Sequence, residues 1–234
     1  QVEMLEIWTD VNGFMTADPR KVKKAYSIER LSYAEAMELS HFGAKVIYTP
    51  TVQPAYKAGI PIVIKNTLNP QNAGTTISME AINGKQNQIK GISSIDKVSL
   101  ITVHGSGLVG TRGLSMRLFG ALAQAGVNII LISQASSEYS ISLAISPDDV
   151  PKAQKAIQDE FEAEIEYRKN IKIKIEDGLS ILAIVGENMK NTPGVAANLF
   201  NSLGRNGVNV VAIAQGSSEL NISAVIPETS LKKA

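Results

Sequence analysis

Two glutamines, Gln134 and Gln215, can bind a small polar ligand. Each follows an apolar, β-branched run and precedes the same Ser-Ser-Glu sequence, which places its amide at the end of a predicted strand. A primary amide offers two donors and an acceptor, which fit the α-carboxylate and α-ammonium groups of an amino acid. The alternative is a plain hairpin in which the serines bond the local backbone. Because turns favour Asn, Asp and Gly, a glutamine at both places favours the binding role.

Charged and hydroxyl side chains near the start of the chain form a second candidate site. Thr9 and Asp10 end an apolar stretch, residues 2–8, where α/β proteins place ligand-contacting groups. Asp10 can accept hydrogen bonds from ribose or amine groups, and Arg20 and Lys45 can face phosphates. Taken alone, the same residues also fit a plainer interpretation, because Asp-Val-Asn-Gly is an ordinary turn and a lone Arg or Lys is usually solvated.

No complete catalytic or metal-binding motif accompanies these residues. The sequence has no G-x-x-x-x-G-K-[ST] loop, and the glycines of residues 105–110 resemble a dinucleotide fingerprint but fall inside a repeat. His41 and His104 have no Cys or carboxylate at ligand spacing, and no Ser-His-Asp arrangement is present. We therefore predict no metal site and no catalytic residue in this chain.

The glutamines belong to a duplicated unit. Residues 127–145 and 208–226 align without a gap at an offset of 81 positions, and 10 of the 19 residues are identical. The same offset matches upstream residues of the first copy to residues of the same type: Gly105, Gly113, Leu118, Phe119 and Gly126. A match of this length without an insertion predicts a repeated supersecondary unit.

Each copy follows the order strand, helix, strand, strand. An apolar run, residues 98–103 or 179–185, leads into a glycine-bearing loop and then into an apolar stripe with helical spacing. Gly126 and Gly207 are expected to end the two helices. Two β-branched runs then flank the glutamine segment as a hairpin.

The first copy contains enough residues to complete a βαββαβ ferredoxin-like unit. Residues 148–161 are predicted to be a helix with Pro151 in its first turn, and residues 163–167 the closing strand. The second copy stops where its last helix is expected to begin. The candidate ligand pocket of the first copy combines Gln134 with a loop, a helix start and a strand start: Ser106, Gly107, Leu108, Gly113 and Asn128.

The first 80 residues have a different pattern, in which strands alternate with helices. Ser32 and Glu35 form a capping-box start to a helix, and Gly59 is expected to cap the next one. This alternation predicts an α/β layer with a largely parallel sheet. The polar segment 83–90 is the candidate boundary. We divide the chain into segments 1–80, 81–170 and 171–234.

Composition excludes several classes of function. A net charge of +1 and an aromatic content of 5% give no basis for nucleic-acid binding, and no apolar run is long enough to cross a bilayer. Having no cysteine excludes disulfides and Cys-type zinc sites and fits a cytoplasmic protein. The chain opens on Gln1 inside an apolar run, so both of its ends are expected to be cut.

These motifs together resemble an aspartokinase over essentially the whole chain. Segments 8–13, 18–20, 31–36, 42–46 and 64–67 resemble the later part of the family's kinase domain, in the family's order. The repeat resembles the two ACT domains that follow it, in a variant close to bifunctional aspartokinase–homoserine dehydrogenases. The resemblance implies the later part of an amino-acid-kinase α/β domain followed by α+β tandem ferredoxin-like ACT domains.

The resemblance also implies ligands and partners. The positions of Thr9, Asp10, Arg20 and Lys45 contact ATP in the family, and the substrate of the whole enzyme is MgATP. Gln134 and Gln215 match residues of allosteric sites, with threonine the expected effector and lysine the alternative. The family typically dimerises through its ACT domains, and it threads one ACT domain into the other, so a strand near residues 90–94 is expected to complete the second unit.

The chain departs from the family in ways that bear on function. Asn12 replaces a usual Asp, Met15 replaces an aromatic of some members, and the family's Lys-Phe-Gly-Gly phosphate loop is absent from these 234 residues. We therefore expect the chain alone to be inactive as a kinase. The main alternative is a non-catalytic ACT-type amino-acid sensor, which the kinase-like first 80 residues disfavour.

Overall fold

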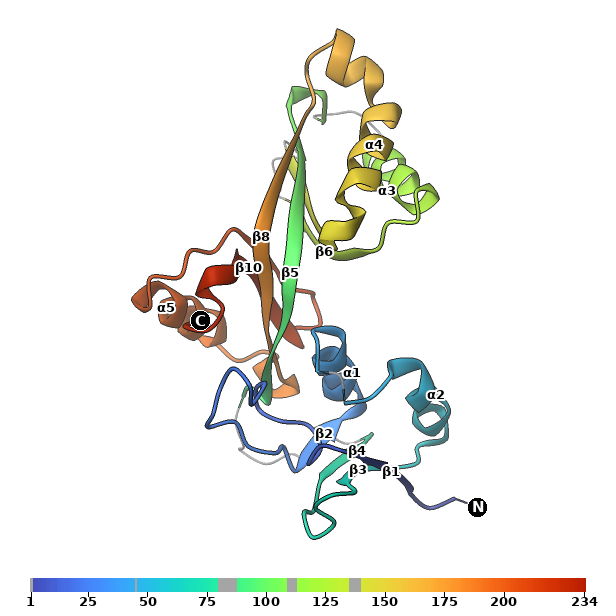
Figure 1. Cartoon of the computed structure of the whole chain (residues 1–234), viewed down its shortest axis with the longest axis vertical. Coiled ribbons are helices and arrows are strands. Elements are labelled where there is room, and N and C mark those ends of the chain that lie inside the picture. The colour runs from blue at the N-terminus through green and yellow to red at the C-terminus, as the bar shows by residue number, and fades with distance from the viewer. Residues whose placement is uncertain (1, 45, 80–87, 109–112, 135–139) are drawn as a thin grey trace.

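The computed structural model describes residues 2–44, 46–79, 88–108, 113–134 and 140–234. The chain forms two β-sheets, a smaller one from its first part and a larger one from the repeat (Figure 1). The smaller sheet lies at one end of the elongated molecule, beside the lower ends of the two longest strands. The α/β part and the ferredoxin-like part predicted from the sequence are therefore both present.

The smaller sheet is mixed. Its order is β1-β3-β4-β2, that is Leu5–Thr9, Ile62–Asn66, Thr75–Ser78 and Arg30–Ser32. β1 pairs with β3 and β2 with β4 in parallel, whereas β3 and β4 are antiparallel. Helices α1 (Tyr33–His41) and α2 (Thr49–Ala58) share a buried apolar core with it.

Local sequence signals set the ends of these helices. The Glu35 N–H donates to Ser32 Oγ (3.1 Å), and the Ser32 N–H donates to Glu35 Oε2 (3.0 Å), which confirms the predicted capping box. Gly59 ends α2 in the left-handed conformation with φ of 65°, as predicted.

The larger sheet has six strands in the order β6-β7-β5-β8-β10-β9, and all its pairings are antiparallel. The strands are β5 (Gly91–His104), β6 (Ile129–Gln134), β7 (Ser140–Ile145), β8 (Lys172–Val185), β9 (Ala212–Ala214) and β10 (Asn221–Pro227).

The long strands β5 and β8 each belong to both repeat units. The later part of β5 pairs with β7 and with the start of β8, whereas residues 91–95 pair with residues 181–185 of β8. The first unit therefore has the order β6-β7-β5-β8 and the second β9-β10-β8-β5. This confirms the expected strand near residues 90–94. The division at residues 80 and 170 stays a prediction about the sequence, and residues 80–87 lie outside the described part.

Glycines allow the fourth strand of each unit to approach the loop after its first strand. A Cβ on Gly105 would overlap the carbonyl of Asn170, and a Cβ on Gly186, the matching repeat position, would overlap the carbonyl of Gln88. The two units therefore have the same close backbone approach at equivalent places.

Three helices cover the outer faces of the larger sheet: α3 (Leu114–Gln124), α4 (Val150–Glu160) and α5 (Val195–Arg205) (Figure 1). Gly126 and Gly207 follow α3 and α5 with positive φ, as predicted. Among the described residues, no helix has the length and apolarity to span a membrane.

The prediction that residues 163–167 form a strand is wrong. Ala163–Tyr167 is a π-helical turn that extends α4, and the strand that closes the unit begins at Lys172. Phe161 is fully buried, and the Ile165 N–H donates to the Phe161 carbonyl (2.9 Å), so helical bonding continues past α4. Burial of Phe161 outweighs the strand preference of Ile165 and Tyr167, which follow it.

The inner faces of the two units pack against each other. Leu100 and Leu131 of the first unit share one buried cluster with Ile181 and Val225 of the second, and Phe42 from the end of α1 belongs to the same cluster. The two repeat units and the kinase-like part are therefore joined by a common core.

Arg117 of α3 forms ion pairs with the end of α4 and with the turn that follows it. Its Nε and Nη1 bond Glu160 Oε1 (2.7 Å) and Glu164 Oε1 (2.8 Å), and its guanidinium lies 4.5 Å from the Phe161 ring centroid.

Arg117→Gln should lower the free energy of unfolding by about 1–2 kcal/mol at pH 7. The hydrogen bond from Arg117 lowers the pKa of Glu164 below its ordinary value of 4.5.

Because that pKa is lowered, the stabilisation is present above pH 4.5 and is lost as the pH falls through the lowered value. Urea unfolding should therefore show a difference between wild type and Arg117→Gln that narrows from pH 7 towards pH 3. Lys155→Gln, at an exposed position on α4, is the control. A difference in unfolding free energy that does not narrow at any pH below 4.5 would contradict the ionic role.

Candidate functional site

The turn that carries Thr9 and Asp10 is fixed by the neighbouring strand. The Thr67 N–H and hydroxyl both donate to the Thr9 carbonyl (2.8 and 3.0 Å), and Asn66 Nδ2 donates to Asn12 Oδ1 (2.7 Å). The Thr9 hydroxyl donates to Asp10 Oδ1 (3.1 Å). The predicted ligand-contacting pair thus lies at the end of a parallel strand, on an exposed turn of defined geometry.

Arg20 lies on a separate loop, residues 16–26, whose base is closed by a Thr16 N–H to Tyr26 carbonyl bond (2.9 Å). Asp18 accepts from Arg20 Nε (3.0 Å) and Nη2 (2.9 Å), and these hydrogen bonds lower the Asp18 pKa. The Arg20 side chain is 88% exposed. In the described part of the chain, no hydrogen bond or ion pair joins Arg20 to Thr9 or Asp10. Lys45 lies outside the described residues.

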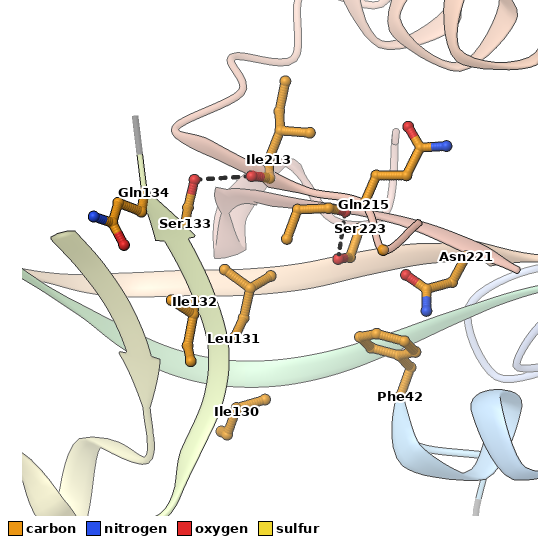
Figure 2. Close-up of a pocket in the computed structure, with 12 residues that line it drawn as sticks. Phe42, Ile130, Leu131, Ile132, Ser133, Gln134, Ile213, Gln215, Asn221 and Ser223 are labelled. Carbon is orange, nitrogen blue, oxygen red and sulfur yellow. Dashed lines mark hydrogen bonds between the residues drawn. The ribbon is translucent and has the colours of Figure 1, made fainter. Parts of the chain in front are cut away.

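Gln134 and Gln215 line one cavity of about 440 Å³ between the two edge strands of the larger sheet (Figure 2). Gln134 is the last residue of β6, and Gln215 directly follows β9. The remaining lining residues come from both edges, from β10 and from the end of α1: Phe42, Ile130, Leu131, Ile132, Ser133, Ile213, Ala214, Gly216, Asn221 and Ser223.

The cavity exists because the edges of the twisted sheet meet. The Ser133 hydroxyl of β6 donates to the Ile213 carbonyl of β9 (2.8 Å), and the Ser223 hydroxyl donates to the Ala214 carbonyl (3.1 Å). At the α1 end of the cavity, Asn221 Nδ2 donates to Glu38 Oε2 (2.7 Å). The kinase-like part therefore contributes to the surroundings of the cavity.

The two glutamine amides point away from each other in Figure 2. Gln134 is paired with Ile141, whose side chain is buried beneath the helices, so Gln134 faces the side of the sheet that carries α3. This is the side of Gly113, which begins α3 with φ of 78°. Both glutamines line the same cavity, but their amide groups do not point to a common position within it.

The predicted loop residues lie at the same end of the sheet as Gln134. Ser106–Leu108 is a 3₁₀ turn directly after β5, and β5 and β6 are both paired with β7. The Gly107 N–H donates to the Asn170 carbonyl (2.9 Å), and Leu108 is buried. Asn128 is exposed at the opposite end of β6, roughly 20 Å from Gln134 along a six-residue strand.

In the second unit the equivalent turn, Glu187–Met189, already has a carboxylate partner. The Glu187 N–H, the counterpart of Ser106, donates to Glu35 Oε1 of α1 (3.0 Å). Glu35 is 1% exposed. Sequence reasoning identified Glu35 as a helix cap but missed this second role, along with Phe42, Glu38 and Ser133, because no sequence signal relates residues so far apart. The described residues contain no cluster of three or more potential metal ligands.

Comparison with known proteins assigns both parts. The amino acid kinase family model matches residues 1–66, and the ACT domain model matches residues 101–161 and 182–234. The bifunctional aspartokinase/homoserine dehydrogenase of Haemophilus influenzae is 44% identical over 95% of this chain, which covers 27% of that protein.

Solved structures of aspartate kinases also resemble this chain over nearly its whole length. The aspartate kinase of Clostridium acetobutylicum superposes with a TM-score of 0.87 and 32% identity over 97% of this chain and 52% of its own. Aspartokinase III of E. coli superposes with 27% identity, at a TM-score of 0.81 with aspartate and ADP and 0.78 with lysine and aspartate. In each state the match covers 99% of this chain and 50% of that of the E. coli enzyme.

The fold and the candidate sites thus define a class, the later part of an amino acid kinase domain joined to a pair of ACT domains. Within that class the chain belongs to the aspartokinase family. It spans about a quarter of the bifunctional relative and about half of the solved aspartate kinases.

Proposed function

We propose that this chain is part of an aspartate kinase, which transfers the γ-phosphoryl group of MgATP to the β-carboxylate of L-aspartate. The observation that carries the proposal is the continuous structural likeness to an aspartate kinase over 97% of the chain. The alternative of a separate ACT-type sensor is disfavoured, because residues 1–66 match the amino acid kinase family. A cytoplasmic location belongs to the same proposal and rests on the absence of cysteine.

In this proposal Thr9, Asp10, Arg20 and Lys45 form one side of the nucleotide site. The Thr67 contacts hold the Thr9–Asp10 turn so that Asp10 can accept from the sugar or the base. Asp18 occupies Nε and Nη2 of Arg20, which leaves Nη1 to face a phosphate. The ADP and aspartate bound by E. coli aspartokinase III support this ligand class.

We further propose that the ACT pair binds a feedback effector, threonine with lysine as the alternative. Gln134, the Ser106–Leu108 turn and Gly113 lie at one end of the first unit, where backbone N–H groups and an amide can hold an amino acid's polar groups. E. coli aspartokinase III has been crystallised with lysine, which supports an amino-acid effector. Asn128 lies too far from Gln134 to share a small ligand with it.

The chain alone is predicted to have no kinase activity. Phosphoryl transfer depends on positioning and on neutralising charge around the γ-phosphate, and these 234 residues contain no Lys-Phe-Gly-Gly sequence. A coupled assay with MgATP and L-aspartate should therefore remain at background. Turnover above background that is lost in Asp10→Asn would show that the chain holds a working site.

Self-association is predicted through the sheet edges. Ile132 and Ile213 occupy the same repeat position on the edge strands and are 47% and 44% exposed. Exposed apolar edge strands favour association. Light scattering should give about twice the chain mass of 25.0 kDa. Ile132→Glu should shift the protein towards monomer, and Met116→Glu, at a 75% exposed position on α3, should not. A monomeric wild type at high concentration would contradict the prediction.

Effector binding is predicted to depend on Gln134 rather than Gln215. In the second unit the Glu187 N–H is already bonded to Glu35, whereas among the described residues its counterpart, the Ser106 N–H, has no such carboxylate partner. Loss of a buried amide contact typically costs about 1–3 kcal/mol, so Gln134→Ala should weaken threonine binding about ten-fold or more. Gln215→Ala, the matched control, should bind like wild type.

Isothermal titration of threonine and lysine into the three proteins is the measurement, with circular dichroism to show that each is folded. If neither amino acid binds wild type, the effector proposal is wrong. If Gln134→Ala binds like wild type while wild type does bind, the effector lies elsewhere.

A further inference from the structure

The two long strands carry a repeated serine–aspartate pair where they pass from one unit to the other. Ser99 and Ser180 are separated by the repeat offset of 81 residues, and so are Asp96 and Asp177. In the β5–β8 ladder, Asp96 and Ser180 both lie between the pairs Ile95–Ile181 and Val98–Leu179, where the register shifts. Ser99 and Asp177 both lie between the pairs Val98–Leu179 and Leu100–Glu176. The two pairs are thus related by the same approximate symmetry as the units themselves.

Only one of the two pairs is bonded. The Ser99 hydroxyl donates to Asp177 Oδ1 at 2.5 Å. The Ser180 side chain is fully buried, and its hydroxyl has no hydrogen-bond partner among the described residues. A buried hydroxyl without a partner is costly and uncommon in native structures, so Ser180 requires an explanation.

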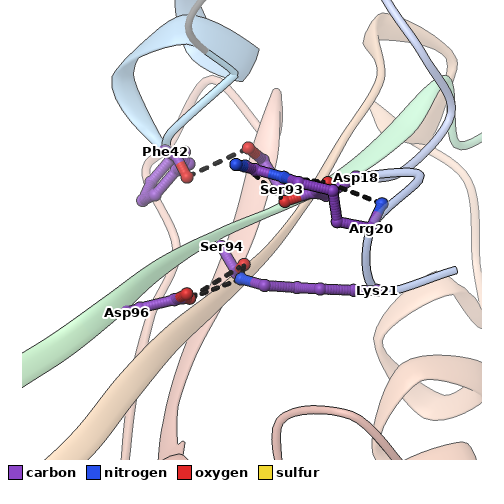
Figure 3. Close-up of polar contacts among 7 residues, drawn as sticks. All are labelled: Asp18, Arg20, Lys21, Phe42, Ser93, Ser94 and Asp96. Atoms are coloured by element: carbon purple, nitrogen blue, oxygen red, sulfur yellow. Dashed lines mark hydrogen bonds and ion pairs between the residues drawn. The ribbon is translucent and has the colours of Figure 1, made fainter.

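Asp96, the partner expected for Ser180, is instead paired with Lys21 of the kinase-like part. Lys21 Nζ lies 2.5 Å from Asp96 Oδ1 and also donates to Ser94 Oγ (2.7 Å) (Figure 3). Among the described residues, no ion pair joins Asp177 to the kinase-like part, so the symmetry of the repeat is broken at this contact.

Lys21 is next to Arg20, on the loop 16–26. The Ile92 N–H of β5 also donates to the Thr16 carbonyl (2.8 Å), at the base of this loop. The loop that carries the predicted phosphate-facing arginine is therefore held on β5, a strand shared by both ACT units.

The ladder is irregular where the strands pass from one unit to the other. Lys97 and Gly178, again equivalent in the repeat, both have positive φ (57° and 70°), and the β5–β8 register shifts between Ile95 and Leu100. A bulge of this kind reorients side chains without breaking the rest of the ladder. Asp96 directly precedes one of these two residues.

We propose that Asp96 is a two-position contact between the ACT pair and the kinase-like part. In one position it holds the loop 16–26 through Lys21. In the other it accepts from the Ser180 hydroxyl, as Asp177 accepts from Ser99, and the loop is released. That the loop 16–26 faces a nucleotide rests on the proposed function, but the change of Asp96 from Lys21 to Ser180 does not.

Hydrogen–deuterium exchange of the loop 16–26 in the whole chain tests this contact without nucleotide or amino acid. Asp96→Asn removes the charge that holds Lys21, so exchange in the loop should become about ten-fold faster. Asp177→Asn is the matched control and should leave the loop unchanged. Lys21→Met breaks the same ion pair from the other side, which keeps the test valid if Asp96→Asn does not fold.

Ser180→Ala distinguishes an Asp96 that alternates between Lys21 and Ser180 from an Asp96 that only binds Lys21. Removing the competing hydroxyl should favour the Lys21-bound position and slow exchange in the loop by about ten-fold, whereas the matched Ser99→Ala should not affect it. In the Lys21→Met background, Ser180→Ala should have no effect on the loop, because the loop no longer competes for Asp96.

The proposal is overturned if Ser180→Ala leaves loop exchange at the wild-type rate, or if it acts equally with and without Lys21. It is also overturned if Asp96→Asn and Asp177→Asn change the loop to the same extent. None of these outcomes depends on effector or nucleotide binding, so they are separable from failure of the proposed function.

Discussion

The antiparallel pairing of β5 and β8 is the contact on which the rest of the structure depends. Each strand is fourteen residues long and supplies an inner strand to one repeat unit and the outer strand to the other. The first unit completes its sheet from one continuous stretch, from the later part of β5 to the start of β8, whereas the second unit needs residues 91–95, which precede the first unit in the chain. Because β5 and β8 run without interruption from one unit into the other, a movement of one unit is transmitted along a pair of strands that the other unit shares.

This shared ladder also decides which parts of the larger sheet are covered. The outer faces of the units are filled by helices, and the inner faces by a common apolar cluster that includes Phe42. Edge strands β6 and β9 meet at a seam, which is bridged by the hydrogen bond from the Ser133 hydroxyl to the Ile213 carbonyl. The cavity and both glutamines lie along this seam because strand edges are the part of the sheet that the core does not cover.

The sequence predicted features whose cause is local or repeated. The Ser32–Glu35 capping box, the glycine at the end of α2 and the two unit helices each follow from residues within a few positions of one another. The segment 163–167 was mispredicted because its β-branched and aromatic residues favour a strand, whereas burial of Phe161 extends the helical path. The meeting of β6 with β9 and the docking of α1 could not be predicted, because they join residues about 80 to 180 positions apart with no pattern that links them.

One carboxylate shows how local and long-range constraints combine. Glu35 Oε2 accepts from the Ser32 N–H and so fixes the start of α1, while Oε1 accepts from the Glu187 N–H of the second unit. Both oxygens of a nearly fully buried side chain are thus used, one within the kinase-like part and one across to the ACT pair. A shift of the Glu187 turn therefore cannot leave α1 unchanged: either the helix follows the turn, or a buried carboxylate oxygen loses its donor. Because Phe42 lies just beyond the other end of the same short helix, in the cluster between the two units, α1 is held by the ACT pair at both ends. The helix therefore connects the buried cluster between the two units to the sheet that carries Thr9 and Asp10.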